Sequence, residues 1–382
     1  MLRPLTAVLL AALSGDPSKG SQTLPRWTPS SEARQSPTRL SAAATGPQPE
    51  PARRAPGATP LPDALGADPP PFRHVEQQRG VALGMFAEDI SFSYAPLLAE
   101  IVALGATHVA LVVPLYQTDA TSHDIGLDTR RSPTLSVVAD VIRAARRDRL
   151  EVMLVPIVRL SSPRAGEWRG TLAPADRAAW FRRYGDVLGE LAAVGAVTGA
   201  ARLAVGSELS SLDGALDHWR PLVERMRAIF PGKLVYSANW DHYRSAAVYD
   251  LVDEEGISAY FNLRDASAPA DDATLEAGWR RVRRDIEAWR VGRTRPLIFT
   301  ELGYRSRAGA TAAPWDETIG GTPDVEEQRR AFAAFRRVWA TAPSLTGVYV
   351  WNWYGYGGPG TTSYTPRGKP AENEVRALLG AM

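Results

Sequence analysis

The chain contains no cysteine and only five histidines among its 382 residues. The absence of cysteine excludes disulfides, thiolate catalysis and cysteine-based zinc sites. The histidines show no HExxH or comparable ligand spacing, so neither a metal site nor a cofactor is expected. Lysine and arginine total 44 against 42 acidic residues, a net charge of +2. This balance gives no electrostatic reason to expect nucleic acid or an anionic membrane as a partner.

The first residues have the pattern of a secretory signal. A basic stretch that contains Arg3 is followed by the apolar run of residues 5–13. This run is too short to span a membrane, and its length is typical of the apolar part of a signal peptide. We therefore predict a signal peptide over residues 1–15 and an exported protein, periplasmic or extracellular.

Residues 16–72 are predicted to be a disordered linker. The chain up to residue 72 holds 14 of the 30 prolines, together with many Ala, Ser and Arg residues and almost no aromatic residues. Such a segment buries too little apolar surface to order itself.

Residues 73–382 alternate short apolar runs with helical patterns. Strands are predicted over residues 80–86, 107–113, 150–158, 202–208, 233–238, 255–260, 296–301 and 346–352. Helices are predicted over residues 95–104, 134–147, 176–194, 216–229, 272–291 and 323–340, with a short one near 246 and a last one from about 372. Eight such units predict an α/β fold, a closed (β/α)8 TIM barrel. The alternative, an open doubly wound sheet, lacks a glycine-rich phosphate turn after its first strand.

Two glutamates stand where apolar runs end. Glu208 closes the fourth predicted strand and Glu301 closes the seventh. The carboxyl ends of the strands are where (β/α)8 barrels carry out chemistry. Glycoside hydrolysis requires at least two carboxyl groups, one as acid and one as nucleophile or base. Different strands can place two such groups at this end of the barrel.

Amide and aromatic side chains follow other strands, and we expect them to bind a sugar. They are Asn239, Trp240, Tyr260, Trp351 and Trp353. Aromatic rings can stack on the apolar faces of sugar rings. Because Trp351 and Trp353 alternate along an extended segment, they are predicted to point the same way.

Several stretches, in this order, resemble glycoside hydrolase family 113, a family of retaining β-mannanase-type barrels. The resemblance extends over residues 80–379, and it rests on GATHVALVVPLYQ at 105–117, GEWRG at 166–170, VGSEL at 205–209, YSANW at 236–240, TELGY at 300–304 and YTPRGKPA at 364–371. It implies that Glu208 is the general acid/base and Glu301 the nucleophile. It further implies that Tyr260 hydrogen-bonds the nucleophile and that Trp351 floors the subsite of the reacting sugar. A retaining enzyme of this type has its carboxyl groups about 5–5.5 Å apart.

Two positions depart from the pattern of the family. Ser207 stands directly before the acid/base, where such enzymes commonly carry an asparagine that binds the sugar 2-hydroxyl. Arg159 follows Ile157 and Val158, where a polar or acidic pair is usual. We expect Ser207 and Arg159 to lie near the reacting sugar and to alter its contacts, so the predicted substrate is β-mannan-like or a related β-linked glycan.

Three functions are considered for a barrel with these residues. The first is a retaining hydrolase of a β-linked polysaccharide or oligosaccharide, and the second is a barrel that binds glycan without cleaving it. The third, an aldolase or metal-dependent hydrolase, finds neither a strand-end lysine for a Schiff base nor a metal-ligand cluster in the sequence.

Overall fold

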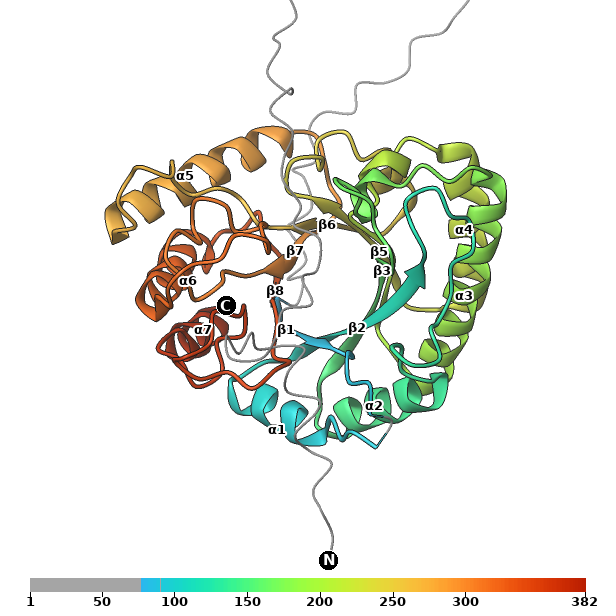
Figure 1. Ribbon diagram of the computed structural model, residues 1–382, viewed down its shortest axis with the longest axis horizontal. Coiled ribbons are helices and arrows are strands. Elements are labelled where there is room, and N and C mark those ends of the chain that lie inside the picture. Colours follow the sequence, from blue (N-terminus) through green and yellow to red (C-terminus); the bar gives the residue numbers. More distant parts are fainter. Residues whose placement is uncertain (1–76, 90) are drawn as a thin grey trace, which may run out of the picture. The chain divides into compact units, whose positions relative to one another are not determined.

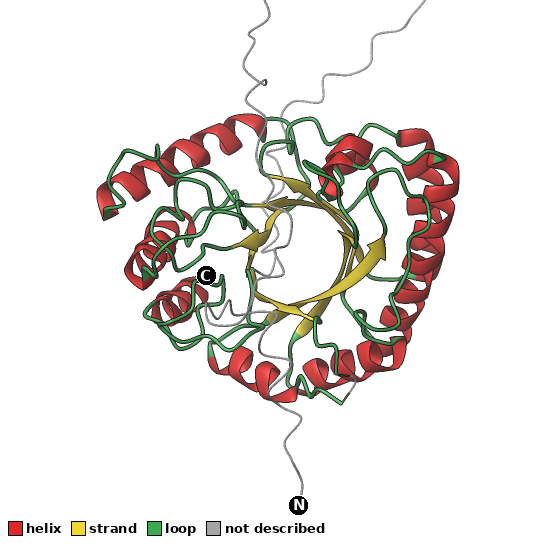
Figure 2. Ribbon diagram, viewed as in Figure 1, coloured by secondary structure: helices red, strands yellow, loops and turns green. Residues whose placement is uncertain are grey.

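The computed structural model describes residues 77–89 and 91–382. The predicted signal peptide and linker lie outside the described residues. Eight parallel strands close into a barrel in the order β1 to β8, and helices surround it (Figures 1 and 2). The prediction of a (β/α)8 barrel is confirmed.

The strands and helices follow one another in the predicted order. The strands are β1 Gln78–Gly84, β2 His108–Gln117, β3 Glu151–Leu160, β4 Arg202–Ser207, β5 Lys233–Asn239, β6 Glu254–Ser258, β7 Leu297–Leu302 and β8 Gly347–Val350. The α-helices are α1 Ala95–Ala103, α2 Leu135–Arg147, α3 Arg177–Thr198, α4 Leu216–Ile229, α5 Asp272–Trp289, α6 Val325–Trp339 and α7 Ala371–Ala381. Short 3₁₀ helices occur at η2 Arg169–Thr171, η3 Ser210–Leu212 and η4 Ala247–Leu251.

Two strands, β2 and β8, differ from the predicted length by three residues, and the other strands differ by one residue at most. β2 continues to Gln117 because its pairing with β3 extends as far as the Gln117–Leu160 pair. β8 ends at Val350 rather than at residue 352. The early end of β8 decides where the tryptophans that follow it point.

Side-chain caps fix where four helices begin after their loops. Thr134 accepts a hydrogen bond from the backbone at the start of α2 (3.3 Å), and Asp176 does so for α3 (2.8 Å). Asp271 caps α5 at 2.8 Å and Asp324 caps α6 at 2.7 Å. Each cap satisfies a backbone N–H that the first helical turn leaves unpaired. The loops that lead into α3 and α6 therefore end at fixed points.

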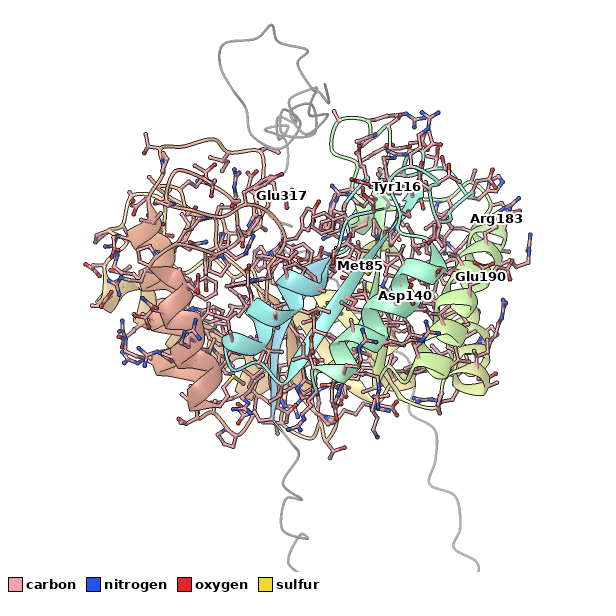
Figure 3. The ribbon with its side chains drawn as sticks, turned by 90° about the horizontal axis from the view of Figure 1, so that it is seen from below. Met85, Tyr116, Asp140, Arg183, Glu190 and Glu317 are labelled. Carbon is pink, nitrogen blue, oxygen red and sulfur yellow. The ribbon has the colours of Figure 1, made fainter. Side chains whose placement is uncertain are left out.

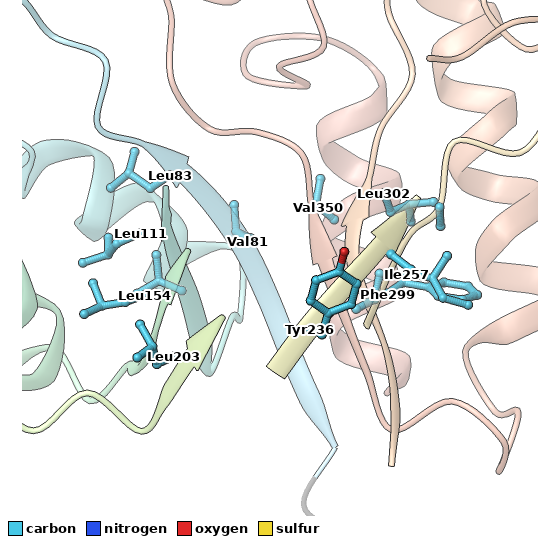
Figure 4. Close-up of a cluster of buried hydrophobic side chains, with 14 of the residues drawn as sticks. Val81, Leu83, Leu111, Leu154, Leu203, Tyr236, Ile257, Phe299, Leu302 and Val350 are labelled. Carbon is cyan, nitrogen blue, oxygen red and sulfur yellow. The ribbon is translucent and has the colours of Figure 1, made fainter. Parts of the chain in front are cut away.

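Alternate residues of each strand enter two separate cores. One set lies between the barrel and the helices, as Figure 4 shows for Leu83, Leu111 and Phe299. The other set fills the barrel interior and includes Ala82 and Met153. Strands buried on both faces are expected to read as continuous apolar runs, which is how they appeared in the sequence.

The amino-terminal end of the barrel is filled by charged and polar side chains. Arg202 pairs with Glu254 and with Glu151, each at 3.0 Å. Gln78 donates to Glu254 at 3.2 Å and accepts from the Tyr349 hydroxyl at 2.8 Å. Because these groups pair with one another, this end is closed by structural contacts. The opposite end holds the cavity described below.

Among residues 77–89 and 91–382, no helix is both long enough and apolar enough to span a bilayer.

Candidate active site

A cavity of about 500 Å³ opens at the carboxyl end of the strands. Six of the nine predicted site residues line it: Glu208, Asn239, Trp240, Tyr260, Glu301 and Trp351. Residues 163–169 of the β3–α3 loop and residues 315–318 of the β7–α6 loop contribute to its walls, as do Asp241 and Tyr364. Figure 3 shows Glu317 at the same end of the barrel as Tyr116, which lies near the end of β2.

Glu208 enters this cavity from an irregular backbone. The β4–β5 register shifts between Ala204 and Gly206, and Glu208 itself has a φ of 55°. A positive φ is uncommon for a residue with a side chain and is often found at functional sites. The carboxyl group is buried and both of its oxygens are engaged. The Ser258 hydroxyl donates to Oε1, and the Arg169 guanidinium forms an ion pair with Oε2.

Glu301 is also buried, but its two oxygens differ. Oε2 accepts a hydrogen bond from the Tyr260 hydroxyl at 2.8 Å. Oε1 finds no hydrogen-bond partner among the described residues. The β6–β7 and β7–β8 registers both shift next to this residue, as they do before Glu208. Irregular pairing of this kind re-aims side chains beside active sites.

Burial and, to a smaller extent, the charge of Glu208 raise the pKa of Glu301 to about 8. Arg169 and the Tyr260 hydroxyl act in the opposite direction but only partly offset these effects. Two like charges in one buried site resist joint ionisation, so the pair retains a proton near neutral pH. The raised pKa of Glu301 and the donors on both oxygens of Glu208 favour Glu301 as the site of this proton. The role implied for Glu301, an ionised nucleophile, therefore requires that the proton move when substrate binds.

Aromatic rings are among the groups that line the cavity. Trp351 packs against Phe86 with ring centroids 6.5 Å apart, and Tyr260 meets the ring of Tyr364 at 5.8 Å. The Tyr364 hydroxyl donates to the carbonyl of Pro314 at 2.6 Å, which anchors the β7–α6 loop. Rings that line a cavity can stack on the apolar faces of a sugar.

Trp353 lies outside the cavity, and the prediction that it points the same way as Trp351 was wrong. Its ring is buried in the outer core, and its Nε1 donates to Glu100 of α1 at 2.8 Å. The alternation of side chains holds only while the backbone stays in the sheet. Because β8 ends at Val350, that alternation stops before Trp351.

Ser207 and Arg159 also lie outside the cavity lining. Ser207 is buried at the end of β4, and its hydroxyl has no partner within the described part of the chain. Arg159 is exposed on β3, with its guanidinium carbon 5.5 Å from the centre of the Phe86 ring. Neither therefore contacts the cavity directly, in contrast to what the resemblance led us to expect.

Several cavity residues were not predicted. Arg169 and Trp168 come from the β3–α3 loop, and Trp315 and Glu317 come from the β7–α6 loop. The only signal for the first loop was its place in the GEWRG stretch. Residues 315–318 carry no local pattern that points to a sugar site.

No group of three or more histidine, aspartate or glutamate residues that could hold a metal ion occurs within residues 77–89 and 91–382.

A (β/α)8 barrel with two carboxyl groups and aromatic rings at the carboxyl end of its strands has the architecture of a glycosidase. The family model for Glycoside Hydrolase Family 113 matches residues 84–359. The chain belongs to this family.

Solved structures agree on the fold. The chain is similar to a family 113 β-1,4-mannanase complex with 21% identity and a TM-score of 0.72, covering 80% of this chain and 100% of that one. It is similar to the β-mannanase of Alicyclobacillus acidocaldarius with 24% identity and a TM-score of 0.71, and the match covers 81% of this chain and 98% of that one. A Faecalibacterium prausnitzii β-glucuronidase shows 15% identity and a TM-score of 0.56, and the match covers 80% of this chain and 49% of that one. No curated protein matches the chain.

Proposed function

We propose that this protein is a retaining glycoside hydrolase that cleaves a β-linked polysaccharide or oligosaccharide by double displacement. The observation that carries the proposal is the placement of Glu208 and Glu301 on one cavity, at the ends of β4 and β7. Membership of a glycoside hydrolase family supports it. The carboxyl separation of about 5–5.5 Å expected of retaining enzymes stays a prediction.

In the first step, Glu301 Oε1 attacks the anomeric carbon while Glu208 gives a proton to the glycosidic oxygen. The bond between the sugar and its leaving group breaks, and a glycosyl ester of Glu301 forms. The absence of a described partner at Oε1 leaves this atom available for attack, whereas Oε2 is steadied by Tyr260. Glu208 then takes a proton from water, and the resulting hydroxide equivalent releases the sugar from Glu301.

The substrate class follows from what the cavity offers. Trp351 and Tyr364 present apolar ring surface, and the acidic side chains of the lining exceed the basic ones. This excess disfavours polyanionic glycans and is compatible with neutral ones. Because two structural neighbours are described as β-mannanases, β-mannan is the first substrate to test.

A glycan-binding barrel without hydrolysis is the second candidate. The ion pair between Arg169 and Glu208 favours it, because a carboxylate held by a guanidinium is not poised as an acid. Binding without catalysis predicts affinity for a glycan and no new reducing ends after prolonged incubation.

The proposal is tested by a reducing-sugar screen over mannans, glucans, xylans and chitosan, with Glu301→Ala as the blank. Wild type is expected to release reducing ends from at least one glycan, and the variant from none, because the attacking oxygen is gone. Added azide should then take the place of the carboxylate and yield a glycosyl azide of inverted configuration. An unchanged rate in Glu301→Ala would exclude Glu301 as the nucleophile.

We also propose that the protein is exported. The support is the sequence alone, in which a basic start precedes the apolar run of residues 5–13. Cell fractionation, with amino-terminal sequencing of the recovered protein, tests this. Recovery of the full-length chain from the cytoplasm alone would contradict it.

A further inference from the structure

Arg169 reaches the cavity from a loop whose backbone is held in place. The Trp168 amide donates to the Thr171 hydroxyl at 3.0 Å, and that hydroxyl donates to the Trp168 carbonyl at 3.0 Å. A Cβ at Gly170 would lie 2.2 Å from the Trp168 ring, so the ring packs directly on the glycine. The backbone at Arg169 is therefore fixed, and any movement of its charge has to come from the side chain.

The guanidinium of Arg169 has few partners for a group so enclosed. Its Nη2 forms the ion pair with Glu208 Oε2, and 24% of its side chain is exposed. Its Nε is buried and lacks a hydrogen-bond partner in the described part of the chain. Its charge also faces Glu301 and Glu317. The pair with Glu208 is thus its one direct ionic contact in the described structure, and its guanidinium carbon also lies 5.8 Å from the centre of the Trp168 ring.

The ion pair between Arg169 and Glu208 opposes the role of Glu208 as a general acid. A general acid needs a protonated oxygen within about 2.6–3.2 Å of the glycosidic oxygen. Ser258 donates to one oxygen of Glu208 and Arg169 to the other, and donors on both oxygens favour the ionised carboxylate. The donors on Glu208 and the raised pKa of Glu301 together favour the reverse of the reactive arrangement, with the proton on Glu301.

We infer that Arg169 is a positioning residue that holds Glu208 ionised in the empty cavity and releases it when a sugar enters on the leaving-group side. This inference rests on the proposed function. The leaving-group sugar has to occupy the space beside Glu208 Oε2, where the guanidinium now lies, and its hydroxyl groups then become partners for Arg169. One O–H bond breaks at Glu301 and one forms at Glu208. The number of protons and the total charge of the pair stay unchanged, and Glu301 becomes the ionised nucleophile.

The first test needs no substrate. Glutamate carboxyl carbons are labelled with ¹³C, and the signals of Glu208 and Glu301 are assigned with the two Glu→Gln variants. In the wild type we expect Glu208 to show the carboxylate shift at pH 6 and Glu301 to carry the proton. In Arg169→Met, the midpoint of the Glu208 titration should rise by about 1–3 pH units, the usual effect of losing an adjacent opposite charge.

Arg177→Met is the matched control, because Arg177 is exposed on α3 and does not line the cavity. It should leave both titrations unchanged. A protonated Glu208 in the wild type at pH 6, or the same Glu208 titration in wild type and Arg169→Met, would overturn the inference. Circular dichroism and thermal melting establish that the variant is folded, and Arg169→Lys provides a second variant that keeps the charge.

The second test follows kcat/KM against pH on a glycan that the wild type cleaves. Loss of the positive charge of Arg169 should move both limbs of the profile to higher pH in Arg169→Met. Arg169→Lys keeps a positive charge and should return both limbs to the pH of the wild type. A merely structural role would lower the rate at every pH and leave the limbs in place. The other titratable groups that face the pair are Tyr260, Tyr364 and Glu317, and they are the same in all these variants.

The two proposals fail in different ways. If Glu208 titrates as expected but no glycan is cleaved, the hydrolase proposal is overturned and the holding role of Arg169 stands. If a glycan is cleaved and Arg169→Met matches the wild type in both tests, the role of Arg169 is overturned and the hydrolase proposal stands.

Discussion

At the scale of single residues, the two carboxyl groups differ in what surrounds them more than in how deeply they lie. Both are about 4% exposed. Glu208 has a donor on each oxygen, whereas Glu301 has the Tyr260 hydroxyl on one oxygen only. Hydrogen bonds of this kind decide which member of a coupled pair holds a shared proton.

Tyr260→Phe removes the hydroxyl that steadies Glu301 and keeps the ring. We expect kcat/KM to fall about 10- to 100-fold, because a hydrogen bond to a charged group contributes about 1.5–3 kcal/mol. The hydroxyl lowers the pKa of Glu301, so its loss should also move the acidic limb of the pH–rate profile upward.

Tyr349→Phe is the matched control for this change. It removes a buried hydroxyl bonded to Gln78 at 2.8 Å, in the barrel interior but outside the cavity lining. It should lower stability by about 1 kcal/mol and leave the pH profile in place. Equal kinetic losses in the two variants would contradict the assigned contact.

Glu301→Gln should stabilise the fold at neutral and alkaline pH. The pKa of Glu301 is about 8 in the folded chain against an ordinary value of 4.5, so the folded state favours the protonated form. Wild type therefore loses stability as the pH rises from about 4.5 to 8, whereas the neutral amide does not. The difference should be absent below pH 4.5 and reach the order of a few kcal/mol above pH 8.

Chemical denaturation at pH 4 and pH 8 measures this difference in the free energy of unfolding. Glu190→Gln, at an exposed position of α3 labelled in Figure 3, serves as the control and should show no such dependence. A Glu301→Gln variant no more stable than wild type at pH 8 would contradict a raised pKa.

At the scale of elements, close backbone contacts between helices and loops set the outer shape of the site. Helix α5 contains Gly278, where a Cβ would lie 2.2 Å from the carbonyl oxygen of Leu263. The loop from β6 to α5 therefore runs directly against the helix. Tyr260 lies in this loop, so the contact helps to fix the segment that carries the site tyrosine.

Gly278→Ala should destabilise the protein although alanine is the better helix former. The helix propensity gain of about 1 kcal/mol is outweighed by a clash with backbone that costs about 1–3 kcal/mol and more. Thermal melting measures the net effect. Gly380→Ala in α7, where nothing lies within 4 Å of the added carbon, should be neutral or slightly stabilising. The same change in melting temperature in both variants would contradict the close contact between Gly278 and the carbonyl oxygen of Leu263.

The elements themselves were predictable, because each strand is buried on both faces and reads as an apolar run. The ends of strands were less so. Nothing local in the sequence shows that β8 stops at Val350, and the misplacement of Trp353 followed from that one boundary.

At the scale of the whole molecule, the cavity brings together residues that lie far apart in the chain. The strand-end residues were found because the eight-fold pattern places every strand end on one rim. Arg169 and Glu317, by contrast, come from loops whose course depends on contacts across that rim. No periodicity encodes such contacts, so these loop residues could be found only from the structure.

A chain that begins at residue 73 should keep the activity of the full-length protein. Every residue that lines the cavity falls between Pro163 and Tyr364, and the barrel closes through β1, which begins at Gln78. We expect kcat/KM within about twofold and an unchanged melting temperature, since single-domain stability depends on the packed core. Loss of activity with the fold intact would show that residues 1–72 contribute to catalysis.

The two loops that wall the cavity have a consequence for how this lineage can change. They follow β3 and β7, which stand four strands apart around the barrel, whereas Glu208 and Glu301 are carried by the strand ends. Mutations in either loop at positions other than Arg169 can therefore accumulate and be selected for a new glycan while Glu208 and Glu301 are retained. Proteins that descend from one such barrel would keep the same catalytic residues and differ in the glycan that they bind.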